Sequence, residues 1–171
     1  MDDIAMVPGA FRVGWEEWAS LPGLGLPALK VKIDTGARTS ALHAFDIEAF
    51  GPATAPKVRF AIHPIPGRDD VSIACSARII DRREVTSSNG EAEWRYVIGS
   101  DIQMGGHRWP IEITLTDRGA MAYRMLLGRQ ALRDDMLITP SARFCQPELS
   151  YDVYHSAAMT DDAPTRALRI C

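Results

Sequence analysis

The spacing of apolar residues predicts that this chain folds mostly into β-strands. Leu29, Val31 and Ile33 alternate with Lys30 and Lys32, which is the two-residue period of a strand with one buried face. Further strand patterns, rich in apolar and β-branched residues, cover residues 58–62, 71–80, 93–98, 102–104, 107–116 and 125–127. We therefore expect an all-β fold, either a barrel or a sandwich.

Turn signals connect several of these strands into hairpins. Residues 87–90 are Ser-Ser-Asn-Gly, and an Asn-Gly pair favours a tight turn with positive φ. A Gly-Gly pair at 105–106 marks a second hairpin. Only residues 129–135 have the pattern of a short helix, and they lie late in the chain.

The periodic patterns define one domain with a tail at each end. The chain has 171 residues, of which 46% are hydrophobic and 24% charged, enough for one ordinary core. Residues 1–12 and 147–171 lack periodicity, and the second segment is rich in Ala, Asp and Thr. We expect a folded domain over residues 13–146, flanked by these N-terminal and C-terminal tails.

Charge and hydropathy exclude two classes of partner. The net charge of −3 offers no basic surface for nucleic acid. No apolar run approaches the roughly 18 residues that span a membrane, and the acidic N-terminus lacks the features of a signal peptide. Cysteines 75, 145 and 171 are odd in number and widely spaced, which favours reduced thiols. The sequence therefore predicts a cytoplasmic protein.

One short motif carries candidate chemistry. The strand at residues 29–33 runs directly into Asp34, Thr35 and Gly36, the arrangement of an aspartic peptidase. Two facing aspartates that share one proton can act together as base and acid, and glycine lets two such loops approach closely. The alternative is an ordinary junction between strand and turn, in which Asp34 caps the turn.

A second element favours the peptidase interpretation. About 90 residues later, residues 125–132 are Met-Leu-Leu-Gly-Arg-Gln-Ala-Leu, and hairpins lie between the two elements. This order resembles the retropepsins, in which a similar segment packs behind the catalytic loop. The resemblance implies a closed barrel with a flap hairpin and one short C-terminal helix. It also implies catalytic roles for three residues and substrate contacts for six, namely Asp34, Thr35 and Gly36, and then Ala37, Arg38, Ser88, Asn89, Gly90 and Arg95.

The motif occurs once, so the second aspartate of a peptidase must come from another copy of the chain. We therefore expect a homodimer that hydrolyses peptide bonds by water attack. The alternatives are a peptide-binding module of the same fold without catalysis, and a metal-dependent peptidase.

Longer stretches resemble a bacterial family labelled "ATP-dependent zinc protease". They cover residues 14–18, 21–22, 32–44, 82–83, 85–90 and 95–98. The resemblance implies an association with ligases that add glutamates to a ribosomal protein, and hence a peptide substrate rich in glutamate. No H-E-x-x-H or G-x-x-x-x-G-K-[ST] motif occurs, and histidines 43, 63, 107 and 155 are scattered. We therefore expect no bound metal and no cofactor.

The position after Asp34-Thr35-Gly36-Ala37 differs from viral retropepsins. Those enzymes carry an acidic residue there, which pairs with the arginine equivalent to Arg129, whereas this chain has Arg38. Arg38 and Arg129 can form a pocket for acidic substrate side chains. Alternatively, a nearby aspartate neutralises Arg129 while Arg38 points to solvent, the candidates being Asp117, Asp134 and Asp135.

Overall fold

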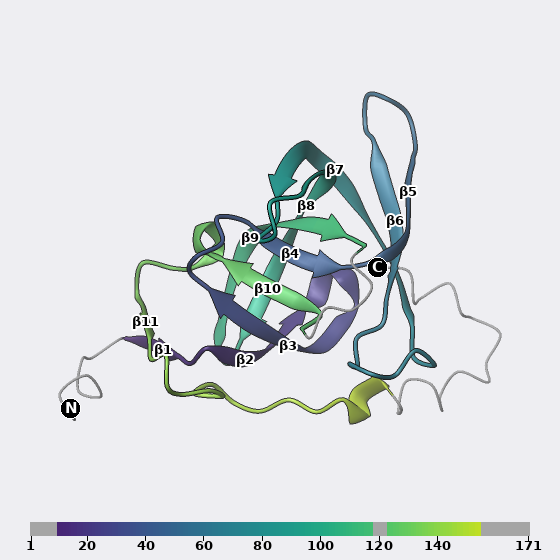
Figure 1. Cartoon of the computed structure of the whole chain (residues 1–171). Coiled ribbons are helices and arrows are strands. Elements are labelled where there is room, and N and C mark those ends of the chain that lie inside the picture. Colours follow the sequence, from purple (N-terminus) through teal and green to yellow (C-terminus); the bar gives the residue numbers. More distant parts are fainter. Residues whose placement is uncertain (1–9, 118–122, 155–171) are drawn as a thin grey trace.

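The computed structural model describes residues 10–117 and 123–154, and most of them lie in β-strands (Figure 1). The predicted all-β class is therefore confirmed. The strands are β1 (Phe11–Val13), β2 (Glu16–Leu21), β3 (Leu26–Asp34), β4 (Ser40–His43), β5 (Phe45–Phe50), β6 (Lys57–Ile62), β7 (Ile73–Thr86), β8 (Ala92–Met104), β9 (His107–Thr116), β10 (Met125–Gly128) and β11 (Met136–Ile138). The 3₁₀ helices η2 (Pro22–Leu24) and η3 (Arg129–Ala131) follow β2 and β10.

Six strands close into the expected barrel. Their order is β2-β3-β10-β4-β9-β8, and the pairing of Ser20 with Gln103 joins β8 back to β2. Strand β8 pairs with β9 on one edge, and its other edge is long enough for two strands, since its first half pairs with β7 and its end with β2. Strands β7, β6 and β5 continue the sheet outward from β8, and the β5–β6 hairpin projects beside the barrel (Figure 1).

The apolar alternation in the sequence points into the barrel as predicted. Leu29 and Val31 in β3 have no exposed surface, whereas Lys32 is exposed. In the described part of the chain, no helix is both long and apolar enough to cross a membrane.

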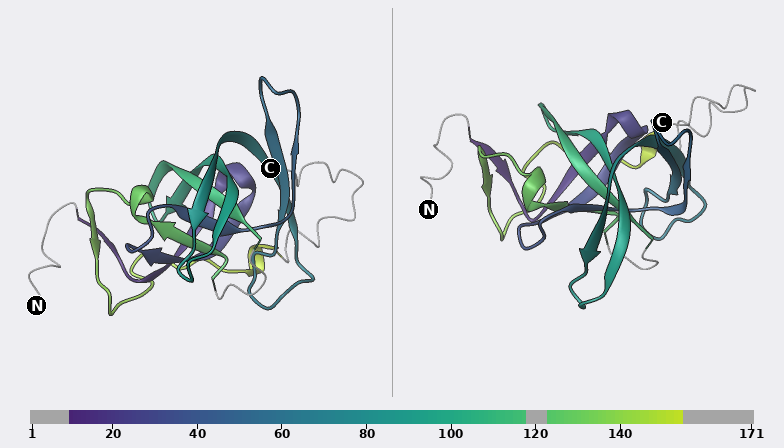
Figure 2. Two further views of the ribbon diagram at one scale, coloured as in Figure 1. Left: turned by 45° about the horizontal axis from the view of Figure 1, so that its top comes forward. Right: turned by 90° about the horizontal axis from the view of Figure 1, so that it is seen from above.

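The predicted flap hairpin is confirmed at the β7–β8 connection. Its strands extend beyond the barrel, and the teal hairpin projects from the molecule when seen from above (Figure 2, right). The Gly90 N–H donates to the Ser87 carbonyl (2.9 Å), and Gly90 has a φ of 87°, a conformation that favours glycine.

The predicted helix at 129–135 is shorter than expected. Only the 3₁₀ turn η3 forms, and Leu132 already has an extended backbone. The backbone groups of this segment are used in tertiary contacts, because the indole of Trp109 donates to the Ala131 carbonyl (2.8 Å). After the turn, the chain enters β11, which pairs with β1 in parallel, a long-range pairing without a local sequence signal.

Ordered packing extends past residues 13 and 146 at both ends. Phe11 lies in β1 and is 1% exposed. Tyr154 is 3% exposed, and its hydroxyl donates to the Ala28 carbonyl (2.5 Å).

A buried carboxylate attaches the segment that follows β11 to the barrel. Glu17 has no exposed surface, and its carboxylate accepts backbone N–H groups from Gly14 (2.7 Å), Cys145 (2.8 Å) and Gln146 (2.9 Å). Hydrogen bonds to a charged group in a buried place are among the strongest in proteins. Glu17 therefore connects two distant segments through a single side chain.

Replacing Glu17 with alanine should lower the free energy of unfolding by about 2–4 kcal/mol, because the change leaves buried N–H groups without an acceptor. The loss of unfolding free energy is measured by urea titration, with tryptophan fluorescence as the signal of unfolding. Glu148→Ala is the matched control, since Glu148 is exposed on the same C-terminal segment. A loss no larger than that of the control would show that Glu17 does not hold this segment.

Candidate active site

Strand β3 presents Asp34 at its end, and the loop after it folds around that side chain. The Oδ1 atom of Asp34 accepts N–H groups from Gly36 (3.1 Å) and Ala37 (3.2 Å). The Oδ2 atom makes no hydrogen bond with any described residue. One oxygen therefore fixes the carboxylate in place, and the other is available for a substrate, a water molecule or a second chain.

The Gly-Arg segment after β10 packs behind this loop, as the sequence predicted. The N–H of Gly128 donates to Ser40 Oγ (3.0 Å), and a Cβ added at Gly128 would lie 2.4 Å from the Thr39 carbonyl carbon. Only glycine permits such a close approach of two backbones. The first N–H groups of η3 then donate to the loop, from Arg129 to the Ala37 carbonyl (2.7 Å) and from Gln130 to the Arg38 carbonyl (3.1 Å).

Arg129 holds the loop through a carbonyl group. Its Nη1 donates to the Thr35 carbonyl oxygen (3.1 Å), and within the described residues it forms no ion pair. Of the carboxylates considered as its partner, Asp135 pairs instead with Arg133 (2.6 Å). A main-chain oxygen thus takes the place of the carboxylate expected in viral retropepsins.

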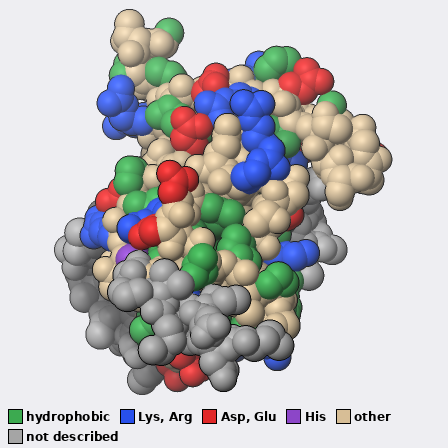
Figure 3. Space-filling view, turned by 90° about the vertical axis from the view of Figure 1, so that its left-hand side faces the viewer, with side chains coloured by type: hydrophobic (Ala, Val, Ile, Leu, Met, Phe, Trp, Pro, Cys, Tyr) green, Lys and Arg blue, Asp and Glu red, His purple; other side chains and the backbone are tan. Residues whose placement is uncertain are grey.

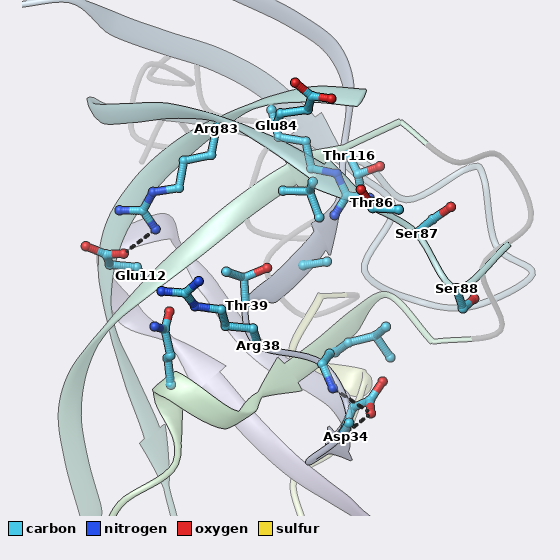
Figure 4. A pocket seen from close by; sticks show the side chains of 17 residues that line it. Asp34, Arg38, Thr39, Arg83, Glu84, Thr86, Ser87, Ser88, Glu112 and Thr116 are labelled. Atoms are coloured by element: carbon cyan, nitrogen blue, oxygen red, sulfur yellow. Dashed lines mark hydrogen bonds and ion pairs between the residues drawn. The ribbon is translucent and has the colours of Figure 1, made fainter. Parts of the chain in front are cut away.

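A cavity of about 950 Å³ opens between this loop and the flap (Figure 4). Of the predicted site residues, the cavity lining includes Asp34, Gly36, Ala37, Arg38, Ser88 and Arg95. The cavity lining also includes residues that the sequence did not assign to the site, and segments far apart in the chain supply them: Thr39, Arg83, Glu112, Thr116, Leu126 and Gln130.

The other predicted site residues lie outside the cavity lining. Thr35 is exposed at the tip of the Asp34 loop. The side-chain oxygen of Asn89 accepts the Glu91 N–H (3.2 Å), and Gly90 completes the flap turn. Asn89 and Gly90 therefore shape the flap tip in this structure.

The arginines that line the cavity differ in their partners. Arg95 is 6% exposed, and its Nε donates to Glu93 (2.5 Å). Arg83 pairs with both Asp81 (2.6 Å) and Glu112 (2.8 Å). Arg38 forms no ion pair with any described residue, and Figure 4 shows its guanidinium on the same side of the cavity as the Arg83–Glu112 pair.

Basic and acidic side chains also lie side by side on the surface. On the face turned toward the viewer in Figure 3, blue basic side chains lie above a group of apolar ones, with acidic side chains beside them.

Arg82 does not line the cavity, and its guanidinium stacks on the exposed ring of Trp94 (5.2 Å). Of these two neighbouring arginines, only Arg83 is therefore placed to bind a ligand in the cavity.

The described residues do not assemble a zinc site. They contain no group of three or more His, Cys, Asp or Glu side chains that could hold a metal ion. His43 is 4% exposed, and burial, followed by the nearby Arg124 guanidinium, lowers its pKa. His63 stacks on Phe45, and His107 stacks on Phe11. His155 and Cys171 lie outside the described residues.

Comparison with known families decides the classification. The profile described as "Retropepsin-like aspartic endopeptidase RimB" matches residues 12–149. The chain belongs to the RimB-like family. The retropepsin-like resemblance predicted from the Asp34 motif is thereby confirmed at the level of the family.

Curated relatives of this RimB-like chain have a different name. A "Probable alpha-L-glutamate ligase" of Shewanella halifaxensis is 49% identical over 140 residues, which is 82% of this chain but 31% of that protein. A protein of the same name from Parasynechococcus marenigrum is 45% identical over 140 residues, 82% of this chain and 30% of its own length. The chain thus spans about a third of the curated relatives that it matches.

A solved structure shares the fold. A crystal structure of a protein of unknown function from Legionella pneumophila superposes with a TM-score of 0.66 at 26% sequence identity. The match covers 78% of this chain and 96% of the Legionella chain. Almost the whole of that protein therefore corresponds to the RimB-like barrel.

Proposed function

We propose that this protein is an aspartic peptidase whose active site forms when the Asp34 carboxylates of two copies face each other. The observation that carries this proposal is the geometry of Asp34, which lines the cavity under the flap and has one carboxylate oxygen without a partner among the described residues. Asp34 is the only aspartate in the lining of that cavity among the described residues. The second aspartate then has to come from another chain.

The mechanism follows from two carboxylates that share one proton. The ionised carboxylate takes a proton from a water molecule as its oxygen attacks the peptide carbonyl carbon, and the protonated one gives its proton to the carbonyl oxygen. The resulting diol collapses when the carboxyl that took the water proton gives it to the leaving nitrogen. The carbon–nitrogen bond breaks, and the other carboxylate takes one hydroxyl proton of the diol, so that the pair again shares one proton. The hydrogen bonds from Gly36 and Ala37 keep Asp34 oriented throughout.

Two features favour this function over a binding module without catalysis. The intact Asp34-Thr35-Gly36 motif is held by the Arg129 side chain and by the pairing of Gly128 beside Asp34, although peptide binding alone would not need such a support. Thr35 and Gly36 are exposed, as residues at a junction between two copies would be in a separate chain. A metal-dependent peptidase is less well supported, because the described residues offer no ligand group.

We further propose that the substrate is a peptide rich in glutamate. The names of the relatives connect this family with glutamate ligation, and a peptidase can remove what a ligase adds. Arg38 supports this substrate, since it lines the cavity without an ion pair among the described residues. Cys75 and Cys145 are thiols, which supports the proposed cytoplasmic location.

The test compares cleavage of matched peptides, one rich in glutamate and one rich in leucine and phenylalanine. We expect Arg38→Ala to lower kcat/KM for the glutamate-rich peptide by about tenfold, because a charge-assisted hydrogen bond is lost. Arg78→Ala is the control, since Arg78 is an exposed arginine outside the cavity lining. Faster cleavage of the apolar peptide, with no effect of Arg38→Ala, would refute the acidic substrate. If neither peptide is cleaved, the peptidase function itself fails.

A further inference from the structure

Arg83 has an unusual position among the arginines that line the cavity. It lines the cavity under the flap and also a second cavity of about 520 Å³ that lies against it. Four residues line both cavities: Thr39, Arg83, Glu112 and Gln130. The ion pair between Arg83 and Glu112 therefore stands at the junction of the two cavities (Figure 4).

The guanidinium of Arg83 is held on one side by a neighbour in the same strand. Its Nε donates to Asp81 (2.6 Å), and the Asp81 carboxylate also accepts the Arg82 N–H (2.7 Å). Asp81 does not line either cavity. This contact therefore orients Arg83 without occupying the edge of the guanidinium that faces the cavities.

The opposite edge of Arg83 is bonded to a carboxylate from another strand. Its Nη1 donates to Glu112 Oε2 (2.8 Å), and Glu112 comes from β9. The Arg38 guanidinium lies on the same side of the cavity (Figure 4). A carboxylate at this place is needed to relieve the repulsion between two guanidinium groups. In the free protein, the Glu112 side chain supplies this carboxylate.

We propose that Arg83 is a second carboxylate-binding subsite, occupied by Glu112 in the free protein and by an acidic side chain of the peptide after exchange. This inference rests on the proposed acidic substrate. Arg38 binds one substrate carboxylate directly, whereas the Arg83 subsite becomes available only when Glu112 is displaced. Asp81 remains in place and keeps Arg83 oriented during the exchange.

The exposure of the pair shows that such an exchange costs little. The side chains of Arg83 and Glu112 are 35% and 53% exposed, and ion pairs at such exposed positions contribute little to stability. Arg95 is different, because it is 6% exposed and bonded to Glu93, which in turn accepts the Thr116 hydroxyl (2.7 Å). Removing Glu93 would leave the buried Arg95 guanidinium without its ion-pair partner, which is far more costly than breaking an exposed pair. Arg83 is therefore exchangeable and Arg95 is not.

The test measures equilibrium binding in the Asp34→Asn protein, where hydrolysis does not interfere. A fluorescent peptide of glutamates and a matched peptide of glutamines are titrated, and anisotropy gives the dissociation constants. Glu112→Gln should tighten binding of the glutamate peptide by about two- to fivefold, because Arg83 loses its internal competitor and an exposed ion pair of this kind is weak. Arg83→Gln should weaken binding by a similar factor, and Glu112→Gln should then have little further effect. The dissociation constant of the glutamine peptide should be the same for all of these variants.

Glu48→Gln is the control for the change of charge. Glu48 lies on β5, outside both cavities, and it forms an exposed ion pair with Arg59 (3.1 Å). If Glu112→Gln leaves binding unchanged or weakens it, Glu112 only ties β9 to the flap and the second subsite is refuted. If the glutamate peptide binds none of the variants, the acidic substrate fails together with this inference. If binding follows the expected pattern but the wild-type protein never cleaves the peptide, the subsite stands and the peptidase function fails.

Discussion

Asp34→Asn should abolish peptide hydrolysis, with a loss of about 10²–10⁴-fold or more, because an amide cannot serve as a general base. The fold should tolerate this change. The side-chain oxygen of asparagine can accept the same N–H groups from Gly36 and Ala37 that Asp34 Oδ1 accepts at 3.1 and 3.2 Å. We therefore expect the free energy of unfolding to change by less than about 1 kcal/mol.

Initial rates on the glutamate-rich peptide, together with urea titration, measure both quantities for Asp34→Asn. Asp69→Asn provides the control, since Asp69 is exposed in the loop between β6 and β7 and lines neither cavity. Full activity in a well-folded Asp34→Asn protein would exclude the aspartic mechanism. A loss of activity that accompanies unfolding would instead assign Asp34 a role in holding the loop.

Mixing experiments should show that each active site needs two intact chains. When Asp34→Asn chains are added in ninefold excess to a fixed amount of wild-type chain, about nine in ten wild-type chains enter mixed dimers. Each mixed dimer carries a single Asp34, so the rate should fall by about tenfold. The substrate is kept in excess over total protein, and light scattering identifies the concentrations at which dimers are present.

The matched control adds the same excess of Glu48→Gln chains, whose change lies outside the cavities. These chains keep Asp34, so the total rate should rise rather than fall. An unchanged rate after addition of the Asp34→Asn chain would mean that one chain is sufficient. In that case the exposed positions of Thr35 and Gly36 would need another explanation.

The position of Arg129 shows how a family motif can keep its role after its partner has changed. The sequence left open whether a substrate anion or an aspartate neutralises Arg129. The structure shows a third solution, in which its Nη1 donates to the Thr35 carbonyl (3.1 Å). A carbonyl of the loop itself can replace a carboxylate because the guanidinium needs only a well-placed acceptor. The Arg38 side chain is therefore not needed to neutralise or hold Arg129, and it is available to bind a ligand in the cavity.

Local patterns in the sequence were sufficient for the all-β class, the hairpin turn and the position of Asp34 at the end of a strand, whereas the closed barrel and the flap followed from the resemblance to retropepsins. Alternation of apolar and charged residues predicts β3 because a strand has a two-residue period. The pair Asn89-Gly90 predicts the flap turn, because glycine readily adopts the positive φ that Gly90 has in the structure. Strand β2 lacked such a signal, because its burial does not alternate: Glu16 and Glu17 are both buried.

Only the tertiary structure decided which arginines are available to bind a ligand in the cavity. The sequence does not show how Arg38, Arg83 and Arg95 differ in their partners. In the structure, Arg38 is unpaired within the described residues, Arg83 is paired at the surface, and Arg95 is buried and paired with the partly exposed Glu93. The helix predicted at 129–135 stopped after one turn for the same reason, since its backbone groups bind the Asp34 loop and Trp109. Partners of this kind lie up to about 100 residues apart, and a local pattern holds no information about contacts at that separation.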